Sequence, residues 1–254
     1  LASVVTAIGL DHTDWLPKGQ RTIDKIIYEK TSSLLKSNII VSNQADNQTL
    51  EKIKKSLASN KSRKVYFNES YSYSLGENNF FYFEDEYGGL KLPIPNLIGD
   101  FQLSNVATAI AALRSIDELN ILDNNIKDGI TRIQSLARFQ EIKSGKLKKI
   151  VNKNKLFVDG AHNPLAAKAL NDYLDKINSN KHVIIGMMLN KEHKKYISYF
   201  KNKINSITTV DIPNQPNSIK GEDLKNKFGT FRTVNYKSSI EEALKSLKLQ
   251  DEDI

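Results

Sequence analysis

Cysteine is absent from the 254 residues of this chain. Its absence excludes disulfide bonds, zinc sites built from thiolates and cysteine nucleophiles, and it is typical of proteins that fold in a reducing compartment. Any metal ion must therefore be held by oxygen atoms or by imidazole nitrogens.

Long apolar runs are absent as well. No stretch of about 18 consecutive apolar residues is present to span a bilayer, and the opening sequence LASVVTAIGL lacks the basic segment and cleavage site of an export signal. We therefore expect no membrane association and a cytoplasmic location. The apolar content of 39% and the charged content of 26% are typical of a globular chain that buries its own core.

Positive charge is in excess, because 37 basic side chains face 29 acidic ones and the net charge is +8. The lysines are spread singly along predicted helices such as residues 191–203, with no dense basic tract and no nucleic-acid-binding motif of interleaved aromatic residues, so a nucleic-acid partner is not expected. A small anionic ligand, such as a nucleotide or a polycarboxylate, suits the charge better.

Apolar strand-like runs alternate with amphipathic helices, which predicts an α/β fold built from parallel βαβ units. In the first half we expect strands at residues 3–10 (buried on both faces), 38–42 and 64–67, helices at 22–35, 48–57, 102–115 and 123–133, and an antiparallel hairpin insert within 71–97. In the second half a small doubly wound sheet is expected from strands at 156–158, 182–186, 206–212 and 231–235, with helices at 164–177, 191–204 and 239–247. The polar segment 134–144 is the expected hinge between the two halves.

The segment FVDGAHNP, residues 157–164, follows the first predicted strand of the second half. Ligands of open α/β sheets bind beyond the carboxyl ends of the strands, and Asp159 comes directly after such an end. Its carboxylate can accept hydrogen bonds from ribose hydroxyl groups, while Gly160 permits a close backbone approach and Asn163 followed by Pro164 can begin a helix. That Asp159 and Asn163 only cap this helix is an open alternative.

Two segments of the first half carry groups suited to a metal ion or a phosphate. GLDHTDWL, residues 9–16, places His12 between two aspartates, a set of ligands that suits Mg²⁺ or Mn²⁺, although a structural histidine is the alternative. Lys30 stands late in a predicted helix beside Glu29, where a solvated helix face is the ordinary explanation.

Asn105 and Arg138 are candidate ligand contacts of a third kind. GDFQLSNVATAIAAL, residues 99–113, begins a helix of small residues beside Gln102 and Asn105, and side-chain amides can both donate to and accept from an adenine edge. The alternative is that Ser104 or Asn105 caps a tightly packed core helix. The segment ARFQEI places Arg138 in the expected hinge, where it can clamp a phosphate or be an ordinary exposed arginine.

The order of these segments is more specific than any one of them. SVVTAIGLDHTDWL, EK, GDFQLSNVATAIAAL, ARFQ and DGAHNP, in this succession, resemble the folylpolyglutamate synthase and dihydrofolate synthase family of the Mur ligase superfamily over nearly the whole chain. The resemblance implies that residues 1–134 are part of a Mur ligase central ATPase domain, a mostly parallel sheet with a β-hairpin insert. It implies that residues 135–254 are a smaller, doubly wound, Rossmann-like glutamate ligase domain, truncated at its end.

The same resemblance implies a magnesium site and two candidate catalytic groups. It assigns His12 and a carbamylated Lys30 to Mg²⁺, since a carbamate turns the ammonium group into an oxygen ligand. It also places His162 and Asn163 near the reacting centre and the incoming glutamate, which makes Lys30 and His162 the candidate catalytic residues.

For ATP, the resemblance implies that Asn105 contacts the adenine, Arg138 the phosphates and Asp159 the ribose. Three positions depart from the family pattern: Ala137 stands where glycine is usual, Phe101 where histidine is common, and Thr31 with Ser32 where a small residue and a glycine often follow the lysine. None of these departures removes a named ligand.

The implied activity is the ATP-dependent ligation of L-glutamate to a carboxylate of folate or dihydropteroate by a monomeric enzyme. The γ-phosphoryl group passes to the carboxylate, and the glutamate amine then attacks the acyl phosphate. Another Mur-type ligase that acts on a cell-wall precursor, and a non-catalytic nucleotide-binding module, are the alternatives. No GxxxxGK[ST] phosphate loop occurs in the 254 residues, so we expect the chain to be part of a longer ligase and to have no measurable activity alone.

Overall fold

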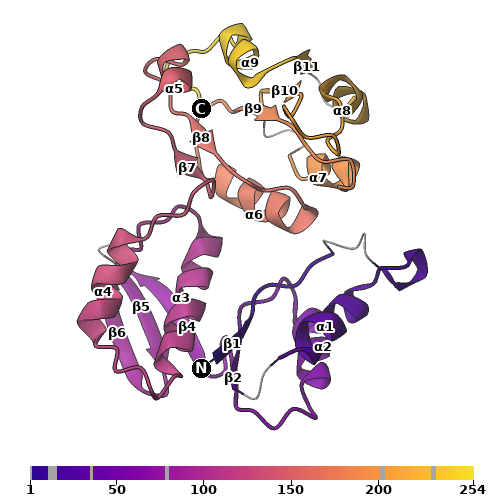
Figure 1. The fold of residues 1–254 in the computed structure, drawn as a ribbon. Helices are drawn as coiled ribbons and strands as arrows, with labels where there is room; N and C mark the ends of the chain where they lie inside the picture. Colours follow the sequence, from indigo (N-terminus) through magenta and orange to yellow (C-terminus); the bar gives the residue numbers. More distant parts are fainter. Residues whose placement is uncertain (1, 11–15, 35–36, 78–79, 201–203, 230–232) are drawn as a thin grey trace. The chain divides into compact units, whose positions relative to one another are not determined.

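The computed structural model describes residues 2–10, 16–34, 37–77, 80–200, 204–229 and 233–254. The chain divides into two compact units, Leu1–Ser135 and Leu136–Ile254, and each combines helices with a three-stranded parallel sheet and a separate set of antiparallel strands (Figure 1). The fold class is therefore α/β, as expected. Within the described residues, no helix is long and apolar enough to cross a membrane.

A three-stranded parallel sheet forms the first part of unit 1. Its strands lie in the order β1-β2-β3, with bounds Ala2–Val5, Asn38–Val41 and Lys64–Tyr66. The helices α1 (Ile23–Ser32) and α2 (Asn47–Ser56) connect them, after a short 3-10 helix at Lys18–Gln20. Both helices begin at side-chain caps, because Thr22 accepts a hydrogen bond from the Lys25 N–H and Asp46 accepts one from the Thr49 N–H.

The strand expected at residues 3–10 is shorter and more exposed than predicted. It ends at Val5, and Val4 is 43% exposed, so the prediction of burial on both faces is wrong for this strand. The strand that is buried on both faces is β2, in which Ile39, Ile40 and Val41 are all 0% exposed. The reason is position, because β2 lies between β1 and β3 whereas β1 has only one neighbour among the described strands.

The insert of unit 1 is a three-stranded antiparallel sheet with the order β4-β5-β6. Its strands are Tyr71–Gly76, Phe80–Asp85 and Gly88–Pro93. The expected hairpin is confirmed as β4 and β5, but the third strand was missed because its opening pair of glycines favours a turn. The helices α3 (Asp100–Arg114) and α4 (Asp123–Arg132) pack against β4 and β6.

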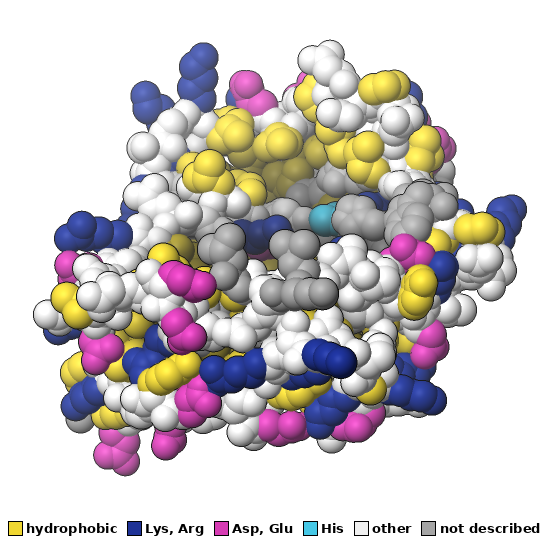
Figure 2. Space-filling model, turned by 60° about the horizontal axis from the view of Figure 1, so that its bottom comes forward, with side chains coloured by type: hydrophobic (Ala, Val, Ile, Leu, Met, Phe, Trp, Pro, Cys, Tyr) yellow, Lys and Arg dark blue, Asp and Glu magenta, His cyan; other side chains and the backbone are white. Residues whose placement is uncertain are grey.

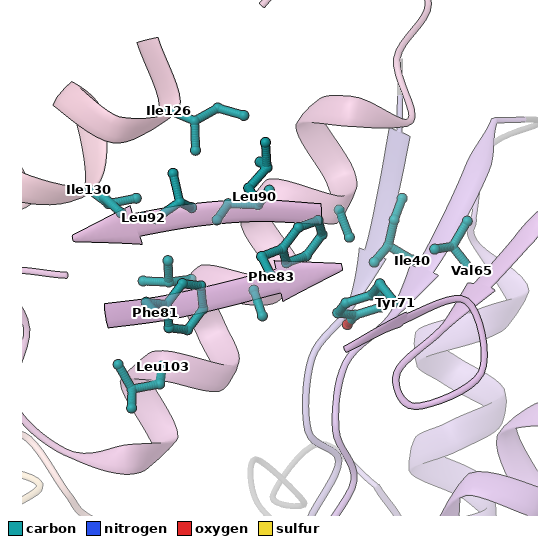
Figure 3. Close-up of a cluster of buried hydrophobic side chains, with 14 residues drawn as sticks. Ile40, Val65, Tyr71, Phe81, Phe83, Leu90, Leu92, Leu103, Ile126 and Ile130 are labelled. Carbon is teal, nitrogen blue, oxygen red and sulfur yellow. The ribbon is translucent and has the colours of Figure 1, made fainter. Parts of the chain in front are cut away.

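One hydrophobic cluster joins the two sheets of unit 1 (Figure 3). Ile40 of β2 points into it, while its neighbours Ile39 and Val41 point into a second cluster with α1 and α2, as the alternation of side chains along a strand requires. The antiparallel sheet contributes Phe81 and Phe83, which are 0% and 1% exposed. Burial of each such ring contributes about 1.5–3 kcal/mol to folding.

Unit 2 contains a three-stranded parallel sheet and a separate two-stranded ladder. The parallel strands lie in the order β11-β10-β9, with bounds Val234–Lys237, Ser206–Val210 and His182–Ile185. The ladder pairs β7 (Gln140–Glu141) antiparallel with β8 (Phe157–Val158). The expectation that all four predicted strands share one sheet is therefore wrong for β8, because its ladder partner is the hinge segment.

The helices of unit 2 surround these strands. They are α5 (Lys146–Ile150), α6 (Pro164–Leu174), α7 (His193–Ser198), α8 (Gly221–Lys227) and α9 (Ile240–Ser246). Helices α8 and α9 both pack against the central strand β10. The helices α5 and α8 were missed, and α7 is shorter than the predicted 191–204.

Candidate functional site

The turn that follows β8 is held by its own polar side chains. Asp159 is partly buried, and its two carboxylate oxygens accept hydrogen bonds from the backbone N–H groups of Ala161 and Phe139, each at 2.7 Å. Asn163 is the N-cap of α6, with its Oδ1 accepting from the Ala166 N–H at 2.8 Å, and Pro164 is the first helical residue. The cap alternative is thus confirmed for Asn163, whereas Asp159 ties the turn to the hinge segment.

His162 lies inside this turn with a defined ring orientation. Its Nδ1 lies 2.9 Å from the Gly160 carbonyl oxygen, and because a carbonyl can only accept, Nδ1 carries the proton of this hydrogen bond. In the neutral ring the remaining nitrogen, Nε2, is then the acceptor and the candidate proton-binding atom.

Arg138 is brought next to this turn. A methyl group built on Gly160 would lie 3.8 Å from Arg138 Nη1 and 3.4 Å from the Ala137 carbonyl oxygen, so the arginine and the glycine backbone are close neighbours. Arg138 is exposed, and its guanidinium group makes no hydrogen bond or ion pair with any residue that the structure describes. Its five N–H donors are available for an anion.

Tyr196 on α7 also belongs to this region. Its side chain is buried, and burial raises the pKa of its hydroxyl group far above the usual range, with the negative charge of Asp159 raising that pKa further. The phenol therefore stays protonated, and its helix α7 packs against α6, the helix that follows the Asp159 turn.

Unit 1 presents Asn105 on the second turn of α3. The Asn105 side chain is exposed, and its Nδ2 donates to Oε1 of the buried Gln102 at 3.1 Å. Helix α3 begins at Asp100 with Gly99 as the N-cap residue, so the alternative that Ser104 or Asn105 caps the helix is wrong.

Gly99 is required at that helix start. Its φ is 105°, in the region that side chains disfavour, and a methyl group there would lie 2.6 Å from the Phe101 ring.

Lys30 lies exposed near the end of α1. Glu29 pairs with Lys25 at 2.7 Å, and across the described residues Lys30 has no hydrogen bond or ion pair of its own. A free ammonium group cannot ligate a cation, so the described residues fit a magnesium site only if Lys30 carries a carbamate. His12 lies outside the described residues, and those residues contain no group of three or more histidine, aspartate or glutamate side chains that could hold a metal ion.

The sequence interpretation overlooked Gln140 and Phe139. Gln140 Oε1 accepts a hydrogen bond from the Ala137 N–H at 3.0 Å, and Phe139 is 5% exposed. Their place in ARFQ beside Arg138 was the available signal, but no sequence pattern indicated that they support the arginine.

Surface charge does not mark a further site on the face drawn in Figure 2. Basic and acidic side chains are interspersed over that face, so the net charge of +8 forms no separate patch there.

Comparison with protein families covers the second unit. Residues 138–254 match the family described as "Mur ligase, glutamate ligase domain". The match begins at Arg138 and includes Asp159, His162 and Asn163, so these four candidate residues of unit 2 lie within it.

Comparison with individual proteins covers nearly the whole chain. The dihydrofolate synthase/folylpolyglutamate synthase of Escherichia coli (strain K12) is 28% identical over 238 residues, which are 92% of this chain and 51% of that protein. This chain therefore spans about half the length of the curated relatives it matches.

Solved structures show the same likeness. The structure of E. coli FolC in complex with DHPP and ADP is 26% identical, has a TM-score of 0.80, and is matched over 99% of this chain and 56% of that one. The Yersinia pestis bifunctional folylpolyglutamate synthase/dihydrofolate synthase, complexed with AMPPNP and a Mn ion, is 23% identical with a TM-score of 0.79, and is matched over 99% of this chain and 57% of that one.

Proposed function

We propose that this chain forms part of an ATP-dependent ligase, because residues 138–254 match the family described as "Mur ligase, glutamate ligase domain" and the chain is similar to folylpolyglutamate and dihydrofolate synthases. The ligase joins L-glutamate to a carboxylate of folate or dihydropteroate through an acyl phosphate. It acts in the cytoplasm, as a monomer. The observation that carries this proposal is the exposed Arg138 beside the Asp159 turn, within the matched segment and with no hydrogen bond or ion pair to a described residue.

Arg138 is the residue we assign to the ATP phosphates. Phosphoryl transfer is catalysed almost entirely by positioning and by stabilising charge, and a guanidinium group presents a fork of donors that fits phosphate oxygens. The guanidinium group has no anionic partner among the described residues, so nothing there competes with a phosphate for its donors.

Asp159 and Asn105 are assigned to the nucleoside. Each oxygen of the Asp159 carboxylate accepts one backbone N–H and retains a lone pair that can accept from a ribose hydroxyl group. The exposed amide of Asn105 can exchange a donor and an acceptor with an adenine edge, and Gln102 holds its orientation.

His162 and Lys30 take the remaining roles. His162, with the proton on Nδ1, presents Nε2 as a group that can take a proton from the glutamate amine. Lys30, as a carbamate, would join His12 in holding Mg²⁺, which when bound neutralises charge on the phosphates.

Steady-state kinetics of the ligase test the arginine. We expect Arg138→Ala to lower kcat/KM for ATP by about 100-fold to 1000-fold, the usual effect of removing one donor that stabilises developing charge. The matched control is Arg132→Ala, because the Arg132 side chain is 81% exposed and its only ion pair among the described residues is with Asp128, at 3.8 Å. Equal activity of Arg138→Ala and Arg132→Ala would overturn the assignment.

The adenine contact is tested with Asn105→Ala. This variant should narrow the preference for ATP over GTP, and an unchanged preference would contradict the adenine contact.

The substrate that receives glutamate needs a separate experiment. Dihydropteroate, tetrahydrofolate and a cell-wall nucleotide precursor are offered together and the glutamylated products are identified. Conversion of the cell-wall precursor alone would show a different Mur-type ligase.

A further inference from the structure

The backbone around Arg138 is held in an unusual conformation. Ala137 and Phe139, the residues on either side of it, have φ angles of 52° and 48°. Neither residue is glycine, so each left-handed conformation costs about 1–2 kcal/mol relative to a right-handed one. Two such residues within three positions persist only where the surrounding contacts determine them.

Three hydrogen bonds hold these two residues. The Ala137 N–H donates to Gln140 Oε1 at 3.0 Å, the Ala137 carbonyl accepts from the Gly160 N–H at 2.8 Å, and the Phe139 N–H donates to Asp159 Oδ2 at 2.7 Å. Together they satisfy both polar backbone groups of Ala137 and the amide of Phe139. Hydrogen bonds of this kind contribute about 0.5–1.5 kcal/mol each, and about 1.5–3 kcal/mol where the acceptor is charged, so they offset the conformational cost.

Ring packing fixes the same segment from inside unit 2. The Phe139 ring stacks on Phe157 of β8 with centroids 4.5 Å apart and planes 17° apart. It meets Tyr173 of α6 edge to face at 4.8 Å. Since Phe139 is 5% exposed, the backbone on its side of Arg138 cannot move without breaking this packing.

Arg138 is therefore fixed through its neighbours and not through its own side chain. All the groups that hold the segment belong to other residues, and none of the guanidinium donors is used among the described residues. Such an arrangement keeps the donors available while it removes backbone freedom, which is the condition for preorganised electrostatic stabilisation. It also makes Arg138 move as one body with the Asp159 turn.

We infer that Gln140 is a positioning residue for Arg138, acting through the Ala137 amide. The inference deepens the proposed function, because the consequence for catalysis rests on Arg138 contacting a phosphate. The structural part stands independently of the reaction. Among the described residues, Gln140 supplies the only side-chain hydrogen bond to Ala137, and the other hydrogen bond of this residue is with the Gly160 amide.

The experiment compares Gln140→Leu with Gln140→Glu. Leucine removes the acceptor and leaves the Ala137 N–H without its partner, whereas glutamate keeps a side-chain oxygen at the same position. The control is Gln134→Leu, at an exposed glutamine of the same linking segment. Amide hydrogen exchange at residues 137–139 is measured in each chain, and kcat and KM for ATP are measured in the ligase.

Gln140→Leu should speed exchange of the Ala137 amide at least tenfold and lower kcat by about 10-fold to 100-fold, with KM for ATP changed less than about threefold, because a small misplacement of a charge-stabilising group acts mainly on the transition state. Gln140→Glu should restore both readouts to within about threefold of the unaltered protein. Gln134→Leu should change neither.

Two outcomes would overturn the inference, and they differ from failure of the proposed function. Unchanged exchange in Gln140→Leu would show that the glutamine does not hold the segment. Faster exchange with unchanged kcat would show that the segment is held but that its position does not matter for turnover. If Arg138→Ala is itself fully active, the proposed role of Arg138 fails, while the exchange result still decides whether Gln140 fixes Ala137.

Discussion

Replacement of Asp159 is expected to weaken unit 2 even when no ligand is present. The carboxylate accepts two backbone N–H groups at 2.7 Å, one of them from the buried Phe139. Asp159→Ala leaves both donors without an acceptor, and removal of a partner from a buried donor costs about 1–3 kcal/mol. Because Ala161 is only partly buried and water can reach its amide, we expect a total loss of about 2–4 kcal/mol.

Two matched variants divide this loss. Asp159→Asn keeps one acceptor oxygen but turns an amide donor toward the other N–H group, so it should lose less free energy of unfolding than Asp159→Ala without matching the unaltered chain. Asn163→Ala removes the N-cap of α6 from the same turn without touching the hinge segment, and should cost about 1 kcal/mol. The expected order of destabilisation is therefore Asp159→Ala, then Asn163→Ala or Asp159→Asn.

Urea unfolding measures the loss of free energy, and hydrogen exchange locates it. For a unit of the size of Leu136–Ile254, a loss of this magnitude lowers the melting temperature by on the order of 10 °C. Exchange should accelerate at residues 137–161 and stay unchanged in unit 1. If Asp159→Ala and the unaltered chain unfold at the same urea concentration and with the same dependence on urea, the two hydrogen bonds of Asp159 do not stabilise unit 2.

Three further changes test other parts of the structure. Ala137→Gly should leave the free energy of unfolding unchanged or raise it by up to about 1 kcal/mol, because relief of the left-handed conformation is opposed by the greater entropy of glycine in the unfolded chain. A clearly lower melting temperature would contradict backbone strain at Ala137. Tyr71→Phe should lower the free energy of unfolding by about 1 kcal/mol, because it removes the hydrogen bond that the Tyr71 hydroxyl group donates to the Val41 carbonyl at 3.2 Å. Burial raises the pKa of Tyr71 from 10.0 to about 12. The protonated hydroxyl group therefore contributes to the free energy of unfolding below pH 10, and this contribution is lost as the pH rises through 12. Tyr71→Phe should flatten the fall in stability over that pH range. The hydrogen bond from the Gln250 N–H lowers the pKa of Asp253 below 3.8. The Asp253 carboxylate therefore contributes to the free energy of unfolding above pH 3.8, and this contribution is lost as the pH falls further. Asp253→Asn should flatten the dependence of stability on pH in acid, and an unaltered dependence would disprove the contribution.

Local patterns predicted most of the elements. Apolar runs located β2, β9 and β10, and the pattern of the insert located β4 and β5, because side-chain periodicity and turn residues are local properties. Errors arose where the partner of a segment decided its state. The pair Gly88 and Gly89 favours a turn in isolation, yet it opens β6 because β5 supplies the hydrogen-bond ladder.

The candidate site shows the same division. Asp159, His162 and Arg138 were chosen from motifs and are held close together in unit 2, whereas Lys30 remains an exposed lysine among the described residues and its carbamate is still a prediction. The support of Arg138 by Gln140 could not be foreseen, because it depends on a left-handed backbone that no residue in ARFQ requires.

By itself, the sequence determined the α/β class, the order of the elements and the chemical groups that are available, since these follow from periodicity, composition and residue identity. Only the tertiary structure decided which strand lies between two others and which acceptor each backbone donor uses. Asp159 illustrates the difference, because its place after β8 follows from the local pattern, but its bond to Phe139 requires residues 20 positions apart to meet. Contacts at that separation depend on the whole packed unit, and a local pattern carries no information about them.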